Sequence, residues 1–312
     1  MATTAVIQTE NLTKAYTRGK YALENLNLRV MEGEIFGYLG PNGAGKTTTI
    51  RLLLDLIRPD MGHATVLGMD AQKDTLKIRR KLGYLPGELN LWDNMIGKQV
   101  LDYVIRVRGG VDANYMRQLI ERLGLDAKLK VRQYSTGNKR KLGLVVAMMS
   151  KPELLILDEP TNGLDPLVQQ TLYQILAEVK AEGRTIFMSS HNLAEVQTNC
   201  DRVGILRNGL LKTVESVHQL RTTDFQWVTI RFRNAVPVSH LAGVPGVSDV
   251  SVHDNTLRLR LAGDFDPLLR AVGDQYIVDI DTEEPSLEEV FLTFYGENNK
   301  QKNIEPKVEV AK

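Results

Sequence analysis

Cysteine and long hydrophobic runs are both nearly absent from this sequence. Cys200 is the only cysteine in 312 residues, so no disulfide can form within the chain, and a reducing compartment is expected. The longest apolar run, LGLVVAMM at 142–149, is far shorter than the roughly 18 residues that a membrane-spanning helix needs. The first stretch, MATTAVIQTENL, has no basic segment followed by an apolar one, so we expect no signal peptide. These absences favour a cytoplasmic protein without a spanning segment.

The chain also lacks an excess of charge of either sign. It has 39 Lys and Arg against 38 Asp and Glu, for a net charge of +1. Proteins that bind nucleic acid usually carry a basic excess that faces the phosphates. We therefore expect no direct contact with nucleic acid. At roughly 150 residues per domain, the length allows about two domains.

Short apolar runs alternate with helical patterns over about the first 215 residues. Strands are expected at 6–8, 26–30, 35–39, 82–85, 154–157, 185–189 and 203–206. Several of them precede helices, as in α/β folds with parallel sheets. The unbroken apolar run LLIL at 154–157 is typical of a strand that is covered on both faces.

The pattern changes after residue 220. The segments 228–233 and 257–263 alternate apolar and polar residues, which predicts strands with one solvated face, and 251–256 is expected to form a turn. Helical patterns at 266–273 and 286–295 flank a further strand at 276–280. We therefore expect a large domain at 1–220, a small α+β domain of the split βαβ type at 221–296, and a disordered polar tail at 297–312.

A glycine-rich loop, GPNGAGKTT at 40–48, lies between an apolar run and a helical pattern. It matches the phosphate-loop pattern G-x-x-x-x-G-K-S/T, whose backbone N–H groups surround phosphate oxygens at a helix N-terminus. Lys46 would reach the β and γ phosphates, and the Thr47 hydroxyl would bind Mg²⁺. The expected nucleotide-binding residues here are Asn42, Gly43, Ala44, Gly45, Lys46, Thr47 and Thr48. The alternative, a glycine-rich turn that binds nothing, is disfavoured by the strand and helix around the loop.

Two adjacent carboxylates end the apolar run LLILDEP at 154–160. Asp158 can hold Mg²⁺ through a water molecule, and Glu159 can polarise the water that attacks the γ-phosphate. By themselves the two residues would more often be solvated acids at a strand end. Together with the phosphate loop they predict a site for ATP and Mg²⁺.

The segment 134–160, YSTGNKRKLGLVVAMMSKPELLILDEP, resembles the ATPase subunits of ABC transporters. Their signature, typically LSGGQ, corresponds to 134–138 here, which keeps Ser135 and Gly137 and departs at three positions. Ser135 is expected to cap the following helix, and Gly137 to allow close backbone approach. The apolar positions expected on one face of that helix are Leu142, Val145, Val146 and Met149. The resemblance implies that Ser135 and Gly137 face the γ-phosphate held by the opposite subunit.

Other residues extend the resemblance. Asp165 in NGLDP resembles the D-loop aspartate at the dimer seam, although the segment could be a simple turn. His191 resembles the switch histidine that contacts the γ-phosphate. Tyr16 resembles the aromatic residue that stacks on adenine, with Tyr21 as the nearby alternative.

One position departs from the family. Gly87 stands where the family usually has a glutamine that senses Mg²⁺, so either Glu88 substitutes for it or water fills the gap. Farther on, Leu91 and Trp92 could line the groove for a membrane subunit or simply pack in a helical subdomain.

The resemblance implies an α/β P-loop ATPase with a helical subdomain, in which Lys46, Glu159 and His191 are catalytic. Two copies, or one copy and a related ATPase subunit, would enclose two Mg-ATP and drive a separate transmembrane permease from the cytoplasmic face of the membrane. The segment 286–296 resembles extensions on drug, antibiotic and polysaccharide exporter ATPases. The alternatives are a soluble ABC-type ATPase that acts on ribosomes or nucleic-acid machinery, and a subunit that binds ATP without hydrolysing it.

Overall fold

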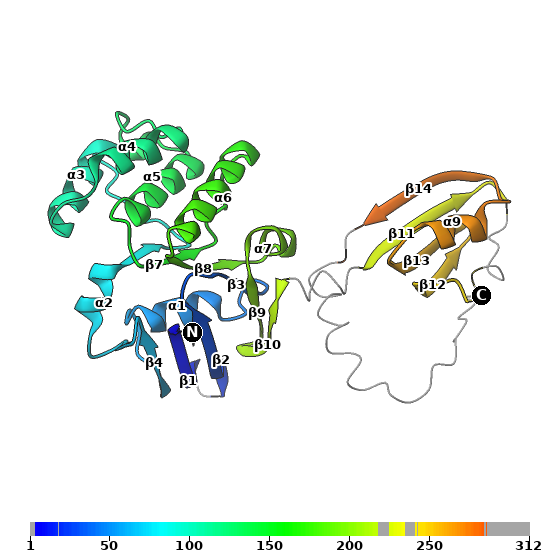
Figure 1. The fold of residues 1–312 in the computed structure, drawn as a ribbon, viewed down its shortest axis with the longest axis horizontal. Coiled ribbons are helices and arrows are strands. Elements are labelled where there is room, and N and C mark those ends of the chain that lie inside the picture. The colour runs from blue at the N-terminus through cyan, green and yellow to red at the C-terminus, as the bar shows by residue number, and fades with distance from the viewer. Residues whose placement is uncertain are drawn as a thin grey trace. The chain divides into compact units, whose positions relative to one another are not determined.

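The chain divides into two compact units, residues 1–218 and 219–312. The computed structural model describes residues 4–17, 19–217, 225–234, 241, 243–283 and 285. Figure 1 shows the two units with their elements labelled. Among the described residues, no helix has both the length and the apolar character to cross a membrane.

The central sheet of the first unit has six strands. Their order is β10 (Leu210–Ser216), β9 (Arg202–Arg207), β3 (Ile35–Leu39), β8 (Thr185–Ser190), β7 (Leu154–Asp158) and β6 (Leu82–Leu85). All neighbours are parallel except the β10–β9 pair. Strands β3, β7 and β8 are buried along their whole length, as the sequence predicts for 154–157. Because these three strands are parallel, their carboxyl ends meet at one edge of the sheet.

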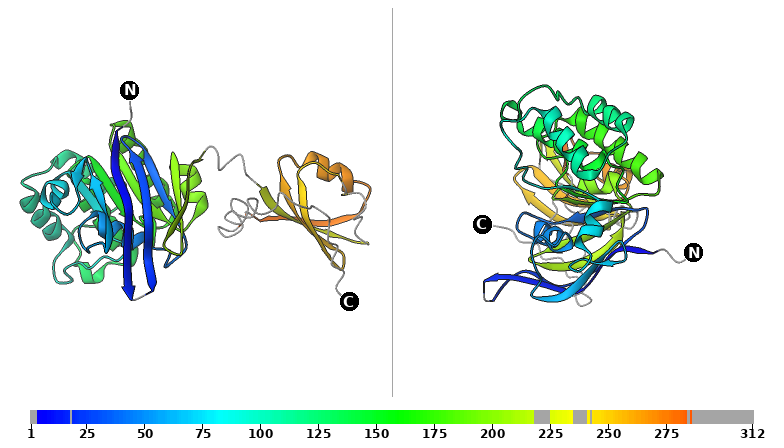
Figure 2. Two further views of the ribbon diagram at one scale, coloured as in Figure 1. Left: turned by 90° about the horizontal axis from the view of Figure 1, so that it is seen from below. Right: turned by 90° about the vertical axis from the view of Figure 1, so that its left-hand side faces the viewer.

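A second sheet in this unit is antiparallel. Its order is β2 (Lys20–Met31), β1 (Ala5–Thr17), β4 (Met61–Val66) and β5 (Met69–Asp70). Figure 2 shows β1 and β2 as long strands that run side by side. The strands expected at 6–8 and 26–30 are thus parts of longer ones, and β4 and β5 were not expected. Buried side chains of β1 and β2, including Ile7 and Leu26, share one core with Phe36 of β3 and Ile50.

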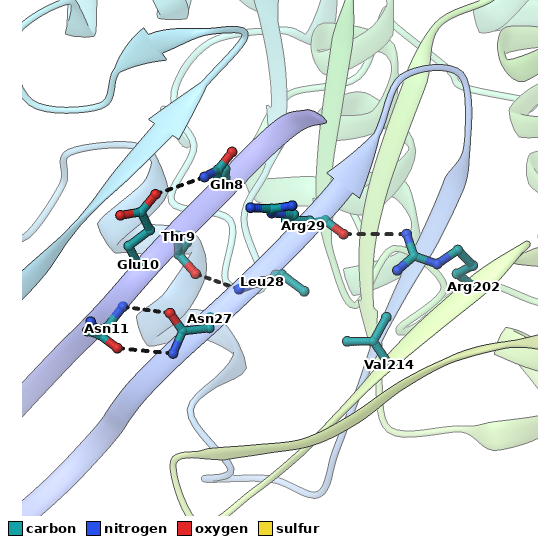
Figure 3. A pocket seen from close by; sticks show the side chains of 9 residues that line it. All are labelled: Gln8, Thr9, Glu10, Asn11, Asn27, Leu28, Arg29, Arg202 and Val214. Atoms are coloured by element: carbon teal, nitrogen blue, oxygen red, sulfur yellow. Dashed lines mark hydrogen bonds between the residues drawn. The ribbon is translucent and has the colours of Figure 1, made fainter. Parts of the chain in front are cut away.

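A groove with mostly polar lining residues is formed by β1 and β2 of this sheet together with β9 and β10 of the six-stranded sheet (Figure 3). The side chains of Asn11 and Asn27 pair across β1 and β2, and the Arg202 guanidinium donates to the Arg29 carbonyl. The residues that line it are Gln8, Thr9, Glu10, Asn11, Asn27, Leu28, Arg29, Arg202 and Val214. None of them is among the nucleotide-site residues expected from the sequence.

Helices surround the parallel sheet. They are α1 (Lys46–Leu53), α2 (Thr75–Lys81), α3 (Gly97–Arg108), α4 (Ala113–Arg122), α5 (Thr136–Met148), α6 (Pro166–Ala181) and α7 (Leu193–Asn199), with a 3-10 turn at Val131–Gln133. In Figure 1, α3, α4 and α5 form a helical region on one side of the unit. Helix α5 contacts α3, α4 and β6. Three of the four positions expected on its apolar face, Leu142, Val145 and Met149, are buried and Val146 is only partly so, but Leu144 and Met148 are buried as well, so the C-terminal half of the helix is buried on more than one side.

The described residues of the second unit form one antiparallel sheet and a helix. The strand order is β12 (Val247–His253), β13 (Thr256–Ala262), β11 (Phe225–Phe232) and β14 (Ile277–Glu283), and α9 spans Asp266–Val272. Alternate residues of β11 and β13, such as Val228 and Leu259, form a core with Leu268 and Val272 of α9. The expected one-sided strands are therefore present. The expected helix at 286–295 and tail at 297–312 lie outside the described residues.

Candidate functional site

The loop after β3 has the conformation that a phosphate loop needs. Gly43 and Gly45 have positive φ angles of 80° and 112°, which L side chains rarely adopt. A Cβ atom on Gly45 would lie 2.4 Å from the Ala22 carbonyl oxygen, and one on Gly40 would lie 2.4 Å from the Leu206 carbonyl oxygen. Helix α1 begins at Lys46, directly after this turn. The free N–H groups at the start of α1 thus open onto the loop.

Lys46 joins this loop to the end of β7. Its side chain is almost fully buried, and Nζ donates to the carbonyl oxygens of Gly40 at 2.5 Å and Pro41 at 3.3 Å. Nζ also lies 3.1 Å from Glu159 Oε1. Desolvating an ion pair costs several kcal/mol per ion, so such a pair is weak support for stability and suits a site that uses its charge.

Asp158 lies at the centre of a cluster of hydroxyl groups. Thr47 Oγ1 donates to Asp158 Oδ2 at 2.9 Å, and Ser189 Oγ donates to Asp158 Oδ1 at 2.5 Å. The Asp158 side chain is buried. Within the described residues no group of three or more His, Cys, Asp or Glu side chains could hold a metal ion by itself. Hydroxyl and carboxylate oxygens fit Mg²⁺, which keeps several waters and shares its coordination with substrate phosphates.

Glu159 has a left-handed backbone conformation. Its φ angle is 51°, and its N–H donates to Ser189, at 3.2 Å from the carbonyl oxygen and 3.1 Å from Oγ. Strained backbone of this kind is concentrated at functional sites. The side chain lies between Lys46 and His191, whose Nδ1 is 2.5 Å from Glu159 Oε2. The structure thus brings Lys46, Thr47, Asp158, Glu159 and His191 together at one edge of the sheet.

A second group of predicted residues lies at the start of α5. Ser135 caps the helix, as predicted, because its Oγ accepts the Asn138 N–H at 3.2 Å. A Cβ atom on Gly137 would lie 2.5 Å from the Gly163 carbonyl oxygen, so the close approach is to the NGLDP loop of the same chain. Asp165 caps α6 by accepting the Val168 N–H at 3.0 Å. No hydrogen bond described here joins this group directly to the phosphate loop.

Tyr16 and Tyr21 are both exposed. The Tyr16 hydroxyl is 3.5 Å from Thr48 Oγ1, which places Tyr16 beside the phosphate loop. Its side chain is 58% exposed and that of Tyr21 is 49% exposed, so exposure does not separate the two aromatic candidates. The contact with Thr48 favours Tyr16.

Two residues of the site were missed by sequence reasoning: Ser189 donates to Asp158, and Arg140 is buried beneath the segment after β6 and the loop after β7. Gly87, the position where the sequence departs from the family pattern, lies against the Asp158 carboxylate. Arg140 lies within the basic run KRK, which resembles a solvated helix face, so the sequence offered no signal for its burial. Gly87 has no side chain, and in the described part of the chain no hydrogen bond or ion pair joins the exposed Glu88 to the residues around Asp158.

Trp92 is half-exposed, and its ring meets that of Tyr103 edge-on at a centroid distance of 5.1 Å. Leu91 is partly buried. Simple burial in a core therefore does not describe Trp92. Contact with a membrane subunit stays a prediction.

Curated proteins are similar to this chain over nearly its whole length. The ABC transporter family matches residues 23–162. The linearmycin resistance ATP-binding protein LnrL of Bacillus subtilis is 31% identical over 307 residues, 93% of this chain and 98% of the relative. The bacitracin transport ATP-binding protein BcrA of Enterococcus faecalis is 33% identical over 302 residues, 93% of this chain and 96% of the relative.

Solved structures share the fold. One described as the ATP-binding subunit of an ABC transporter has a TM-score of 0.64 at 31% identity and covers 69% of this chain and 92% of that one. An ATP-binding cassette solved as a dimer with ADP and Pi has a TM-score of 0.61 at 24% identity and covers 68% of this chain and 98% of that one. At this identity the likeness supports the fold alone. The predicted α/β P-loop fold of the ABC type is confirmed. The chain belongs to the family of ABC transporter ATP-binding proteins and is an ABC-type ATPase.

Proposed function

We propose that this chain is the ATP-hydrolysing subunit of an exporter, which dimerises around two Mg-ATP and drives a separate transmembrane subunit from the cytoplasmic face of the membrane. One observation carries the hydrolytic part. The phosphate-loop residues Lys46 and Thr47 contact Glu159 and Asp158, and Glu159 in turn contacts His191. An anion-binding loop, two carboxylates and a histidine thus meet within hydrogen-bonding distance.

The phosphate loop and Lys46 would bind the nucleotide. The N–H groups at the start of α1 and the Lys46 ammonium supply fixed positive charge where negative charge develops on the γ-phosphate. Lys46 can exchange its contacts with the Gly40 and Pro41 carbonyls for phosphate oxygens without leaving the loop. Tyr16, exposed beside Thr48, would stack on adenine.

Thr47 and Asp158 would hold Mg²⁺, Thr47 through its hydroxyl and Asp158 through a water molecule. When bound, Mg²⁺ neutralises charge on the phosphates. Ser189 keeps the Asp158 carboxylate oriented by donating to Oδ1, which leaves Oδ2 directed at Thr47. This arrangement accounts for a fully buried carboxylate at the end of an apolar strand.

Glu159 would accept hydrogen bonds from the attacking water and orient it. The left-handed backbone at Glu159 turns its side chain back over the loop, toward Lys46 and His191. His191 is half-exposed, on the side of Glu159 away from Lys46. Its Nδ1 faces the Glu159 carboxylate, so the other ring nitrogen can donate to the γ-phosphate when both ring nitrogens carry a proton. Both residues therefore act on the same phosphate from neighbouring strand ends.

Dimerisation would complete the site. Ser135 caps an α5 N-terminus that is exposed in the single chain, and Asp165 stands at the exposed start of α6. Each α5 N-terminus would meet the γ-phosphate held by the partner subunit, so ATP favours the closed pair and hydrolysis releases it. The exporter assignment is supported by relatives named for linearmycin resistance and bacitracin transport.

The test uses Glu159→Gln beside the wild type, with light scattering and phosphate release in Mg-ATP. We expect hydrolysis to fall by about 10²-fold or more, while ATP drives the variant into dimers. Glu153→Gln is the matched control, because it changes a carboxylate at the opposite end of β7 that pairs with Lys81. Wild-type hydrolysis by Glu159→Gln would contradict the catalytic assignment. A monomer under all conditions, with the membrane subunit added, would contradict the dimer.

A further inference from the structure

Arg140 is a buried cation in α5, beneath the loops of the nucleotide site. Only 4% of the residue is exposed, whereas its neighbours Lys139 and Lys141 are partly exposed. Its guanidinium donates to the carbonyl oxygens of Pro86 at 2.8 Å and Gly87 at 2.8 Å. It also donates to the carbonyl oxygens of Asn162 at 3.4 Å and Asp158 at 3.5 Å. One side chain thus joins α5 to the segment after β6, the end of β7 and the loop that follows Glu159.

All of these partners are backbone carbonyls rather than carboxylates. Burial lowers the pKa of Arg140, and the negative charges of Asp158 and Glu159 oppose that shift. A guanidinium offers five N–H donors in a rigid planar fork, so it can hold several carbonyls in fixed positions at once. A lysine ammonium in the same place would be a single point with three donors. The contacts of Arg140 therefore require its shape as well as its charge.

Gly87 connects Arg140 to the carboxylate of Asp158. While the Gly87 carbonyl accepts from Arg140, its Cα packs so closely that a Cβ atom would lie 3.0 Å from Asp158 Oδ2. Oδ2 is the same oxygen that accepts from Thr47. The position of the 86–87 backbone thus limits where the Asp158 carboxylate can lie.

We propose that Arg140 is a positioning residue for ATP hydrolysis, which holds Gly87 against Asp158 and the NGLDP loop against α5, and so orients the two carboxylates. The inference rests on the proposed roles of Asp158 and Glu159. In this arrangement the backbone at position 87, held in place by Arg140 of α5, makes the contact with Asp158 that a side chain at this position would otherwise make. Because Arg140 lies five residues after Ser135 on the same helix, a movement of the α5 N-terminus also reaches Asp158 through it.

The test measures ATP hydrolysis by Arg140→Ala as Mg²⁺ is titrated, with ATP binding measured separately without Mg²⁺. Partners that orient a metal ligand are typically worth about 10–100-fold in metal affinity or activity. We expect the half-saturating Mg²⁺ concentration to rise about 10-fold and metal-free ATP binding to stay within about two-fold. Arg140→Lys should restore less than about a tenth of the lost activity, because it lacks the fork.

Arg108→Ala is the matched control. Arg108 on α3 is also partly buried and also donates to backbone carbonyls, those of Arg79, Arg80 and Leu82. A general loss of folded protein would lower the maximal rate of both variants without moving the Mg²⁺ half-saturation. An unchanged Mg²⁺ half-saturation in Arg140→Ala, with a rate loss equal to that of Arg108→Ala, would overturn the proposal.

Gly87→Ala provides a second route if Arg140→Ala does not fold. The added methyl group must displace Oδ2 of Asp158, so the same rise in Mg²⁺ half-saturation is expected. Gly273→Ala is its control, since a Cβ there meets a carbonyl oxygen at 3.1 Å in the second unit. Glu159→Gln is run in parallel. If that variant hydrolysed ATP normally, the proposed function would fail, whereas normal Mg²⁺ dependence in Gly87→Ala and Arg140→Ala would refute the role of Arg140 alone.

Discussion

The two units of the chain place their charged side chains in different surroundings. In the first unit, Lys46 and Glu159 are paired at 3.1 Å with side chains only 6% and 14% exposed. In the second unit, Arg231 and Asp279 are paired at 3.4 Å with side chains 58% and 62% exposed. The separations are similar, but burial differs greatly. An exposed pair costs little to form and contributes little, whereas a buried pair must overcome desolvation.

This contrast distinguishes charged side chains that keep a surface solvated from charged side chains that take part in the proposed reaction. The charged residues of β11 and β14 pair on a solvated sheet face, which is an ordinary surface. Lys46, Asp158 and Glu159 lie at the edge where the parallel strands β3, β7 and β8 end, and their neighbours leave little of these three side chains exposed. Burial at this edge of the sheet, rather than the number of ion pairs, marks the site.

The largest effect is expected from Lys46→Ala. Loss of the ammonium removes the charge that faces the phosphates and leaves the buried Glu159 carboxylate with His191 as its remaining partner. We expect hydrolysis to fall by about 10²–10³-fold. Phosphate release measures it, with Lys14→Ala as the control, since Lys14 pairs with Asp60 away from this loop. If hydrolysis fell equally in Lys14→Ala, the buried charge at the site would matter no more for hydrolysis than a charge elsewhere on the chain.

A core substitution tests whether the two units are stable independently. Leu259→Ala in β13 and Leu155→Ala in β7 each remove a fully buried side chain and should cost about 2–5 kcal/mol in the unit that contains it. Scanning calorimetry should resolve two transitions, with each variant lowering only one. Leu259→Ala should leave ATP hydrolysis at the wild-type level below its own transition. A single transition lowered by both variants would show one cooperative unit.

Glu195 predicts a pH dependence confined to the first unit. Burial raises the pKa of its carboxyl, with a smaller contribution from Glu159, while hydrogen bonds from Ser190, Thr161 and Tyr173 oppose the shift. The folded carboxyl therefore holds its proton more tightly than the unfolded one, whose ordinary pKa is 4.5. Its contribution to stability is complete below that pKa and is lost as the pH rises through the folded-state pKa.

Urea unfolding of Glu195→Gln against wild type, at a series of pH values, measures this dependence. We expect the wild type to lose stability relative to the variant as the pH rises above 4.5. Glu121→Gln is the control, because it changes an exposed carboxyl on α4. A constant difference between Glu195→Gln and wild type at every pH would contradict the prediction.

The smallest effect is expected at the Arg231–Asp279 pair. Since both side chains are mostly exposed, a double-mutant cycle with Arg231→Gln and Asp279→Asn should give a coupling energy below about 1 kcal/mol. The coupling should weaken further in high salt. A coupling of several kcal/mol would mean that this sheet face is covered in the native protein. The two units would then both contain buried charged pairs.

Much of the site could be predicted from the sequence. The loop at 40–48, the acids at 158 and 159 and the histidine at 191 each follow a short apolar strand, and the structure places all of them at one edge of the sheet. A local cue also predicted that Ser135 caps α5, whereas the capping of α6 by Asp165 was not predicted. The one-sided strands of the second unit followed from their alternating pattern.

Other features could not be predicted, because they depend on surroundings distant in the chain. Strand β4 is exposed at its first three residues and β5 has only two residues, so their apolar pattern is weak. Helix α5 was expected to carry its apolar residues on one face, but Leu144 and Met148 outside that face are buried as well. Arg140 is buried by the segments that follow β6 and β7, although its place in a basic run assigns it to solvent.

The sequence by itself determined the chemistry of this protein: which residues can bind phosphate, hold a metal ion and orient water, because those signals lie in short contiguous motifs. Only the tertiary structure decided how those residues are held. Arg140 reaches Pro86 and Gly87 across 54 and 53 residues of chain, and Ser189 reaches Asp158 across 31. Such contacts depend on how strands and helices are packed together, and packing brings distant segments to hydrogen-bonding distance in a way that no local pattern encodes.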